Sequence, residues 1–271
     1  MPAYDFDFQR YVARRKGARE AQVREGAAYA FPGDVRLLRT LDRLRPVQLA
    51  LEETARLWRA VARAELLGTA VRAGTEHYPS VAQAAARCAQ RLHIEVPTVY
   101  ITPQPASQGA RTLGTSEDAY IVVAAGLLEG LSGDELLDVI GRECGRIQNG
   151  HVPFLTALYY LTTSASDFVR WMVLPATLTL SAWERRAVIT ADRAGLLCSR
   201  SLEVSLSALR KSVMGDEATV SRRARALSRF AGSAYYRTVI GLDPSAGEPQ
   251  EACDAAVARI LDDKDGETEP R

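Results

Sequence analysis

A glutamate flanked by two arginines occupies the pattern in this chain that comes nearest to known catalytic chemistry. Residues 141–146 read Gly-Arg-Glu-Cys-Gly-Arg. In the pattern H-E-x-x-H, two histidines one helical turn apart hold a zinc ion, and the glutamate acts as the general base in peptide hydrolysis. Here Glu143 keeps the place of that glutamate, but Arg142 and Arg146 stand where the histidines would be. Because a guanidinium keeps its proton and has no lone pair for a cation, these residues cannot bind zinc.

Other residues offer few ways to rebuild a metal site. The chain has three histidines, His77, His93 and His151. A compact site made by His151 with Cys144 and Cys198 would require a coincidence of geometry. We expect isolated histidines and cysteines to be ordinary core or surface residues, and Cys144 to face the core. No G-x-S-x-G elbow, P-loop or dinucleotide fingerprint is present either.

Composition is that of an ordinary globular protein of 271 residues, with 47% apolar and 25% charged residues. The net charge of +1 gives no support for nucleic-acid binding. The four cysteines, Cys88, Cys144, Cys198 and Cys253, form no C-x-x-C pair, and the first ten residues are polar rather than signal-like. We therefore predict reduced thiols and a cytoplasmic location.

One apolar segment, Val152–Leu180, is interrupted by Asp167, Arg170 and Pro175. Two helices packed in a core are favoured over a membrane hairpin, so membrane association is the weaker alternative. Aromatic residues are concentrated there, and core packing is favoured over an interface with a partner. They are Phe154, Tyr159, Tyr160, Phe168, Trp171 and Trp183.

The periodicity predicts an α+β, mainly helical fold with a small three-stranded sheet. Ser132 and Glu135 form an S-x-x-E capping box that predicts a helix from there to about Asn149. The other expected helices lie at Pro46–Val71, after Pro79, at Trp183–Cys198, at Leu202–Met214, at Val220–Val239 and at Glu251–Leu261. The expected strands are Val99–Thr102, Ala110–Leu113 and Ala119–Val123.

The order of these segments resembles the HtpX-type family of zinc metallopeptidases, which also contains the CAAX prenyl proteases and has a gluzincin fold. The similarity covers roughly Leu67–Arg200. It rests on Pro97–Ile101, on Ala119–Leu128 and on Leu131–Gly141, which precede the altered helix motif.

The resemblance implies roles for individual positions. Arg142 and Arg146 stand at the first two zinc-ligand positions, Glu143 at that of the general base, and Val188 at that of the third ligand. Asp192 matches the family's aspartate four residues after that ligand. The family's edge strand, which receives substrate by strand addition, corresponds to Gly109, Ala110, Arg111 and Gly114, with Gly109 in place of an asparagine.

All three zinc-ligand positions are thus replaced, so we predict an inactive peptidase homologue without a cofactor. Zinc would otherwise neutralise the carboxylates under the cleft, and we expect the arginines to do so instead. We predict that Arg142 pairs with Asp192 and that Glu143 pairs with one of the two arginines. The alternative is a residual zinc metalloendopeptidase with a rebuilt site.

Such a protein would act by binding a peptide or protein, or as a regulatory or structural subunit of an active homologue. The arginine-rich cleft suits an acidic peptide, for which the acidic end Asp262–Arg271 is a candidate. We predict three regions: a helical extension (1–66), a metallopeptidase-like domain (67–242) and an acidic, largely disordered tail (243–271).

Overall fold

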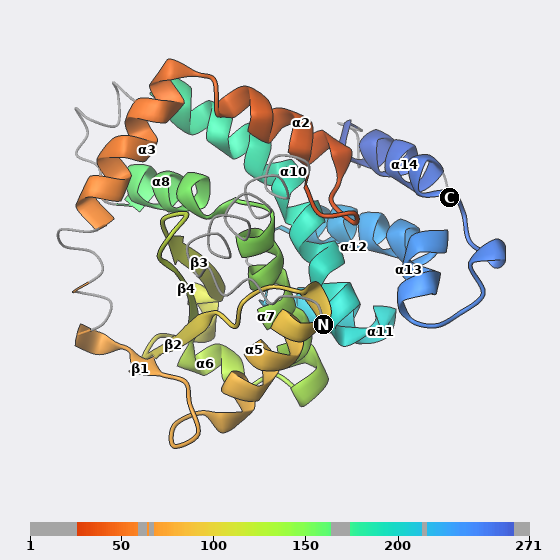
Figure 1. Ribbon diagram of the computed structural model, residues 1–271, viewed down its shortest axis with the longest axis horizontal. Helices are drawn as coiled ribbons and strands as arrows, with labels where there is room; N and C mark the ends of the chain where they lie inside the picture. Colours follow the sequence, from red (N-terminus) through yellow and green to blue (C-terminus); the bar gives the residue numbers. More distant parts are fainter. Residues whose placement is uncertain (1–25, 59–63, 65–67, 164–173, 213–215, 263–271) are drawn as a thin grey trace, which may run out of the picture.

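The computed structural model describes residues 26–58, 64, 68–163, 174–212 and 216–262 (Figure 1). The helices in this part of the chain are α2 (Pro32–Leu41), α3 (Arg45–Leu57), α5 (Pro79–Leu92), α6 (Ala125–Leu128), α7 (Gly133–Gln148), α8 (Val152–Thr163), α10 (Leu174–Ser199), α11 (Leu202–Ser212), α12 (Glu217–Ala231), α13 (Ala234–Val239) and α14 (Gln250–Asp262). Two short 3-10 helices are η2 (Ala106–Gln108) and η3 (Pro244–Ala246). The strands are β1 (Val71–Arg72), β2 (Thr98–Thr102), β3 (Ala110–Gly114) and β4 (Ala119–Ala124).

The four strands form one mixed sheet in the order β1-β2-β4-β3. β2 and β4 run parallel, while β1 and β3 pair antiparallel on the two sides. The α+β, mainly helical fold predicted from the sequence is confirmed. The expected count of three strands is wrong, because Val71, placed at the end of a helix, instead begins the two-residue strand β1.

Side chains of alternating strand positions cover the two faces of the sheet, as the pleat requires. One face packs on α5 and α7 through Val99, Ile101, Ile121 and Val123. The other carries Leu113, Tyr120 and Val122, which pack with Trp58 and with tyrosines of α8. The edge strand β3 contacts both α7 and α8.

Helices α7 and α10 pack against each other at the centre of the molecule (Figure 1). Glycines make this close approach possible. A Cβ atom added to Gly145 would lie 2.3 Å from the Cβ of Ala194, and one added to Gly141 would lie 2.5 Å from the Cβ of Cys198. On α10, a Cβ at Gly195 would lie 2.8 Å from the Cγ of Arg142.

Several expected helix boundaries differ from those observed. The helix expected over Pro46–Val71 is present as α3 up to Leu57, and residues 59–63 and 65–67 of that range lie outside the described part. The helix expected from Trp183 begins earlier, at Leu174. The single helix expected over Val220–Val239 is two. α12 ends at Ala231, and the Ser233 side chain accepts a hydrogen bond from Tyr236 N to start α13.

Both ends of the described chain join the packed structure. Tyr29, before α2, belongs to the main core, and α2 packs on α10. The expected helix over Glu251–Leu261 is present as α14, which packs on α12. The expectation of a largely disordered tail is therefore wrong for residues 250–262, because Cys253, Ala256 and Val257 are buried there. Residues 263–271 lie outside the described part.

The apolar segment Val152–Leu180 contributes α8 and the start of α10, while residues 164–173, including Phe168 and Trp171, lie outside the described part. Phe154 and Trp183 are in a buried cluster with α2 and α3 residues. Among the described residues, none of the helices combines the length and apolar character needed to cross a bilayer.

Candidate functional site

The helix α7 carries the altered motif, and its N-terminus is capped. The Ser132 side chain accepts a hydrogen bond from Glu135 N, and the Glu135 carboxylate accepts one from Ser132 N, which completes the predicted capping box. Glu135 also pairs with Lys211 of α11 at 2.7 Å. The first turn of α7 is thus fixed to a neighbouring helix, and this sets the direction of the residues that follow.

Glu143, in the place of the general base, is buried, and each of its carboxylate oxygens has a protein neighbour. Its Oε2 accepts a hydrogen bond of 2.8 Å from Thr112 Oγ1 on the edge strand β3. Its Oε1 lies 3.4 Å from Nε of Arg146. The prediction that Glu143 pairs with one of the two arginines is confirmed. Thr112 was missed, because only the folded sheet brings it to the motif.

Arg142, at the first ligand position, does not pair with Asp192, so that prediction is wrong. Its Nε lies 2.9 Å from Asp138 Oδ2, and its Nη2 donates a hydrogen bond of 2.7 Å to Ser212 Oγ of α11. Asp138 stands one helical turn before Arg142 on the same face, so it is the nearer carboxylate. The i, i+4 spacing of Asp138 and Arg142 is visible in the sequence, but the resemblance to the family pointed to Asp192 instead.

Asp192 is instead held by Arg223 of α12. Nε of Arg223 donates to Oδ2 at 2.9 Å and Nη2 donates to Oδ1 at 2.7 Å, a bidentate contact between buried side chains. The spacing of Arg223 from Ala226, Leu227 and Phe230 places it on the apolar face of the helix, unlike the nearby Arg222 and Arg225, and this signal was not used. The partner could not be identified without knowing how α12 lies on α10.

The two ion pairs lie in one buried cluster, in which Asp138 and Asp192 repel each other. Burial raises the pKa of Asp138 to about 6, although the Arg142 guanidinium opposes this change. One of its carboxylate oxygens, Oδ1, has no hydrogen-bond partner among the described residues. Asp138 was not identified from the sequence as part of the site.

Val188, at the third ligand position, serves as a core residue. It belongs to a buried cluster with Phe31, Ala226 and Val257, which come from the start of α2, from α12 and from α14. An aliphatic side chain supplies no donor atom. The three residues at the ligand positions therefore do not fit a zinc ion, which requires neutral imidazole, thiolate or carboxylate ligands.

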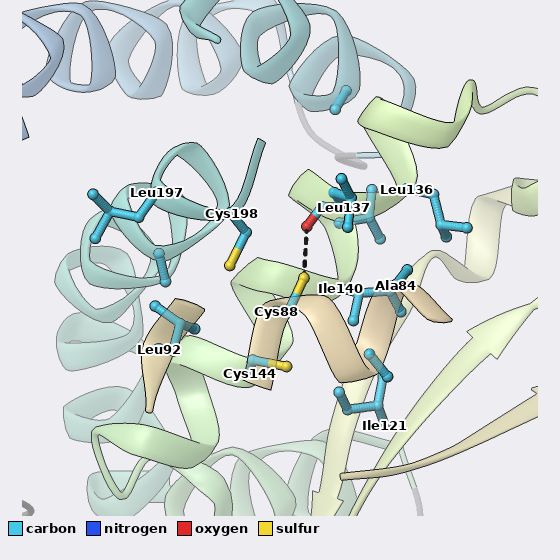
Figure 2. Close-up of a cluster of buried hydrophobic side chains, with 14 of the residues drawn as sticks. Ala84, Cys88, Leu92, Ile121, Leu136, Leu137, Ile140, Cys144, Leu197 and Cys198 are labelled. Carbon is cyan, nitrogen blue, oxygen red and sulfur yellow. Dashed lines mark hydrogen bonds between the residues drawn. The ribbon is translucent and has the colours of Figure 1, made fainter. Parts of the chain in front are cut away.

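The residues considered for a rebuilt metal site are divided between two places. Cys144 and Cys198 lie with Cys88 in the main core, where α5, α7 and α10 meet (Figure 2). His151 lies elsewhere, with Nε2 3.0 Å from Asp34 Oδ2 and its ring edge-on to Trp183. Across the described residues, no three histidine, cysteine or acidic side chains are arranged to hold a metal ion.

Asp34, which was not singled out from the sequence, is the centre of this second buried polar group. It also accepts hydrogen bonds from Trp183 Nε1 at 2.8 Å and Thr190 Oγ1 at 2.6 Å. Burial acts to raise the pKa of Asp34, but His151 and these donors hold it below its usual value. The group fastens α2 to α10 and to the start of α8.

Among the described residues, no other strand pairs with the outer side of the edge strand β3, but most of that side is covered, since Thr112 and Gly114 are buried and Ala110 is half-buried. Hydrogen bonds from Ala124 N to Gly109 O and from Thr115 N to Asp118 O place the odd-numbered residues of β3 toward β4. The backbone groups of Ala110, Thr112 and Gly114 therefore point away from the sheet. Gly114 N donates to Thr156 Oγ1 of α8 at 2.9 Å, so α8 covers that end.

Beside this edge, Gly109 has the positive φ of 62° that glycine tolerates, and it leads from η2 into the strand. Arg111 lies over the ring of Tyr159 at 5.1 Å and donates to Gln104 and Gln108. The predicted edge residues 109–114 are thus together, next to Glu143.

Comparison with protein families matches residues 76–238 to peptidase family M48. This match covers more than half of the chain and includes the sheet, α7 and α10. The chain belongs to peptidase family M48. No solved structure gives a significant match.

Relatives of this M48 member are similar over limited lengths. It is 29% identical to the plastoglobule-localized metallopeptidase 48 of Arabidopsis thaliana over 154 residues, which are 56% of this chain and 45% of that protein. It is 36% identical to protease HtpX of Acinetobacter baumannii (strain AYE) over 76 residues, or 28% of this chain and 25% of the relative. With protease HtpX of Shewanella sp. (strain W3-18-1) the identity is 32% over 90 residues, or 33% and 31%. The matched segments span less than half the length of these relatives.

Proposed function

We propose that this M48 member is a catalytically inactive homologue that acts by binding a peptide or protein. The observation that carries the proposal is the pairing of both family carboxylates with arginines of the chain itself. Glu143 is held by Arg146 and Thr112, and Asp192 is held by Arg223.

With these contacts, the residues at the family's site positions lack both features that peptide hydrolysis in this family requires, a free general base and ligands for a metal ion. A general base must accept a proton from water, and it needs a free oxygen directed at that water. Both oxygens of Glu143 face protein donors or cations instead. In addition, guanidinium and isopropyl groups at the three ligand positions cannot polarise a carbonyl group as a metal ion does.

The outward edge of β3 is the surface that supports peptide binding best. An added strand could reach the half-buried Ala110 at the start of β3, in the manner of strand addition. Arg111 on the same strand favours an acidic ligand. The partner is a peptide or protein, with an active homologue and the chain's own residues 262–271 as candidates.

The proposal is tested by the zinc content and the peptidase activity of the purified protein after expression with added zinc. We expect less than a tenth of a zinc ion per chain by mass spectrometry and no cleavage of unfolded casein above that of a Glu143→Gln control. About one zinc per chain, or cleavage that this control abolishes, would establish the alternative, a residual zinc metalloendopeptidase.

A gain-of-metal variant tests the assignment of the ligand positions. Arg142→His, Arg146→His and Val188→Glu together should restore three donors around one point, so the triple variant should bind about one zinc while the parent chain binds none. A variant with the first two changes alone is the matched control, and it should bind zinc at least tenfold more weakly. Equal zinc binding by both would show that Val188 is not at the third ligand position.

A further inference from the structure

A groove between α12 and α14 lies apart from the altered zinc motif. Its volume is about 590 Å³, and three arginines and two serines line it together with small apolar residues. Arg225, Arg229, Ser221 and Ser228 come from α12, and Arg259 comes from α14, with Ile260 beside it. The two helices lie side by side at the end of the molecule away from the sheet (Figure 1).

The helix α12 has one side buried in the interior and another side exposed beside α14, where the groove lies. On α12, the buried residues Arg223, Ala226 and Phe230 face the interior, where Arg223 holds Asp192. The arginines Arg225 and Arg229 lie on a different side of the same helix and are exposed. One face of α12 therefore stabilises the interior, while another faces solvent beside α14.

Charge in the groove is unbalanced. Acidic side chains do not line it, and within the described residues neither Arg225 nor Arg259 has a carboxylate at ion-pair distance. Arg229 has one, Glu248, at 3.4 Å, and both side chains are about half exposed. An exposed pair of this kind is worth little and can be exchanged for another carboxylate.

The length over which the charge is spread distinguishes between kinds of anion. Ser221 and Arg229 are eight residues apart, which is about 12 Å along a helix at a rise of about 1.5 Å per residue. An extended peptide rises about 3.3 Å per residue, so roughly four residues would span the groove. A single small anion would contact only part of it. Apolar contacts at Ile260 and the alanines suit small aliphatic side chains between carboxylates.

We propose that this groove is a binding site for an acidic peptide segment of a partner protein, with carboxylates on Arg225, Arg229 and Arg259 and small aliphatic side chains between them. Guanidinium groups hold carboxylates through paired hydrogen bonds, and the serine hydroxyls can donate to backbone carbonyls. The site is separate from the edge of β3, so it does not depend on whether the zinc motif is inactive.

A binding measurement with the full chain tests the proposal. The probe is a fluorescein-labelled octapeptide that alternates glutamate and alanine. The matched control peptide has glutamine in place of glutamate. We expect fluorescence anisotropy at 100 mM salt to show saturable binding of the glutamate peptide and at least tenfold weaker binding of the glutamine peptide. Failure of the glutamate peptide to bind below 1 mM would overturn the proposal.

Substitutions locate the site. Arg225→Gln with Arg259→Gln should weaken binding at least tenfold, while Arg36→Gln with Arg43→Gln, which removes the same charge from exposed positions around α2, should change it less than twofold. Arg225→Lys with Arg259→Lys keeps the charge without the planar fork and should give an intermediate loss. An equal effect of the groove and control pairs would show that only overall charge matters and would overturn the site.

The same assay separates a partner from the chain's own acidic end. A chain that stops at Asp262 should bind the glutamate peptide within twofold of the full chain. A tenfold gain on removal of residues 263–271 would identify those residues as the occupant and would overturn the assignment to a partner protein.

Discussion

Arg223 and Arg146 neutralise the two family carboxylates with different geometry. Arg223 meets Asp192 with two short hydrogen bonds, whereas Arg146 lies 3.4 Å from Glu143 and the closer contact of that carboxylate is with Thr112. A buried, bidentate contact is the more sensitive of the two to loss of one partner, because the remaining charge is left without compensation.

Replacing Arg223 with glutamine should therefore lower the free energy of unfolding by about 3–5 kcal/mol, the range for breaking a buried ion pair. The measurement is urea unfolding at pH 7, followed by circular dichroism. Arg222→Gln, one residue away and not paired with Asp192, is the matched control and should stay within about 0.5 kcal/mol of the parent chain.

A second change distinguishes charge from packing. Asp192→Asn combined with Arg223→Gln removes both charges and should recover a large part of the loss, since no buried charge remains unpaired. Purely additive effects of the two changes would contradict the role given to the pair.

For individual residues, the sequence predicted some contacts of the site and missed others. The position of Glu143 beside an arginine followed from spacing along one helix, and so did the opportunity for Arg142 to meet Asp138. The partner of Asp192 did not, because it lies 31 residues away on a helix whose orientation depends on the whole core.

Among the elements, the crossing of α7 and α10 positions most of the site. Gly141 and Gly145 on α7 face Cys198 and Ala194 on α10 so closely that a methyl group would overlap them. Because packed interiors resist such overlap, the distance between these helices depends on the two glycines.

Gly145→Ala should accordingly destabilise the protein by about 1–3 kcal/mol through overpacking, even though alanine is the better helix former. Gly133→Ala makes the same change in the first turn of α7, where a Cβ atom meets nothing within 4 Å, and should be neutral or slightly stabilising. Thermal unfolding of both variants provides the comparison. An equal melting temperature for the two would show that α7 and α10 can move apart at little cost.

Elements with strong local signals were predicted well. The capping box of Ser132 and Glu135 located the start of α7, and the β-branched run Val99–Thr102 located β2. The segments expected next, Ala110–Leu113 and Ala119–Val123, are β3 and β4. The two-residue strand β1 and the break between α12 and α13 were missed. β1 exists only through its pairing with β2, and Ser233 marks a helix start that is visible only once Gly232 has ended α12.

For the molecule as a whole, the buried carboxyl of Asp138 connects stability to pH. Its pKa in the folded state is about 6, above the ordinary value of 3.8. The folded state therefore binds the proton more tightly than the unfolded chain does. Stability from this group is fully present below about pH 4 and is lost as the pH rises through about 6.

Asp138→Asn removes this dependence, so the stability of the variant relative to the parent should increase by about 2 kcal/mol between pH 4.5 and pH 7.5. A constant offset is expected as well, since Arg142 loses its partner, and only the slope against pH is diagnostic. Urea unfolding of both proteins across that range gives the slope. Parallel curves would mean that Asp138 has the same pKa in both states.

Because Arg223 neutralises Asp192, we expect folding to depend on the order of synthesis. A metal ion from solution would be available as soon as its ligands existed, but Arg223 is made 31 residues after the carboxylate it serves. At about 5–20 residues per second, a ribosome needs roughly 2–6 seconds to cover that stretch. During this delay the growing chain holds an aspartate that cannot be buried at low cost, so α10 should settle onto α7 only after α12 has been translated.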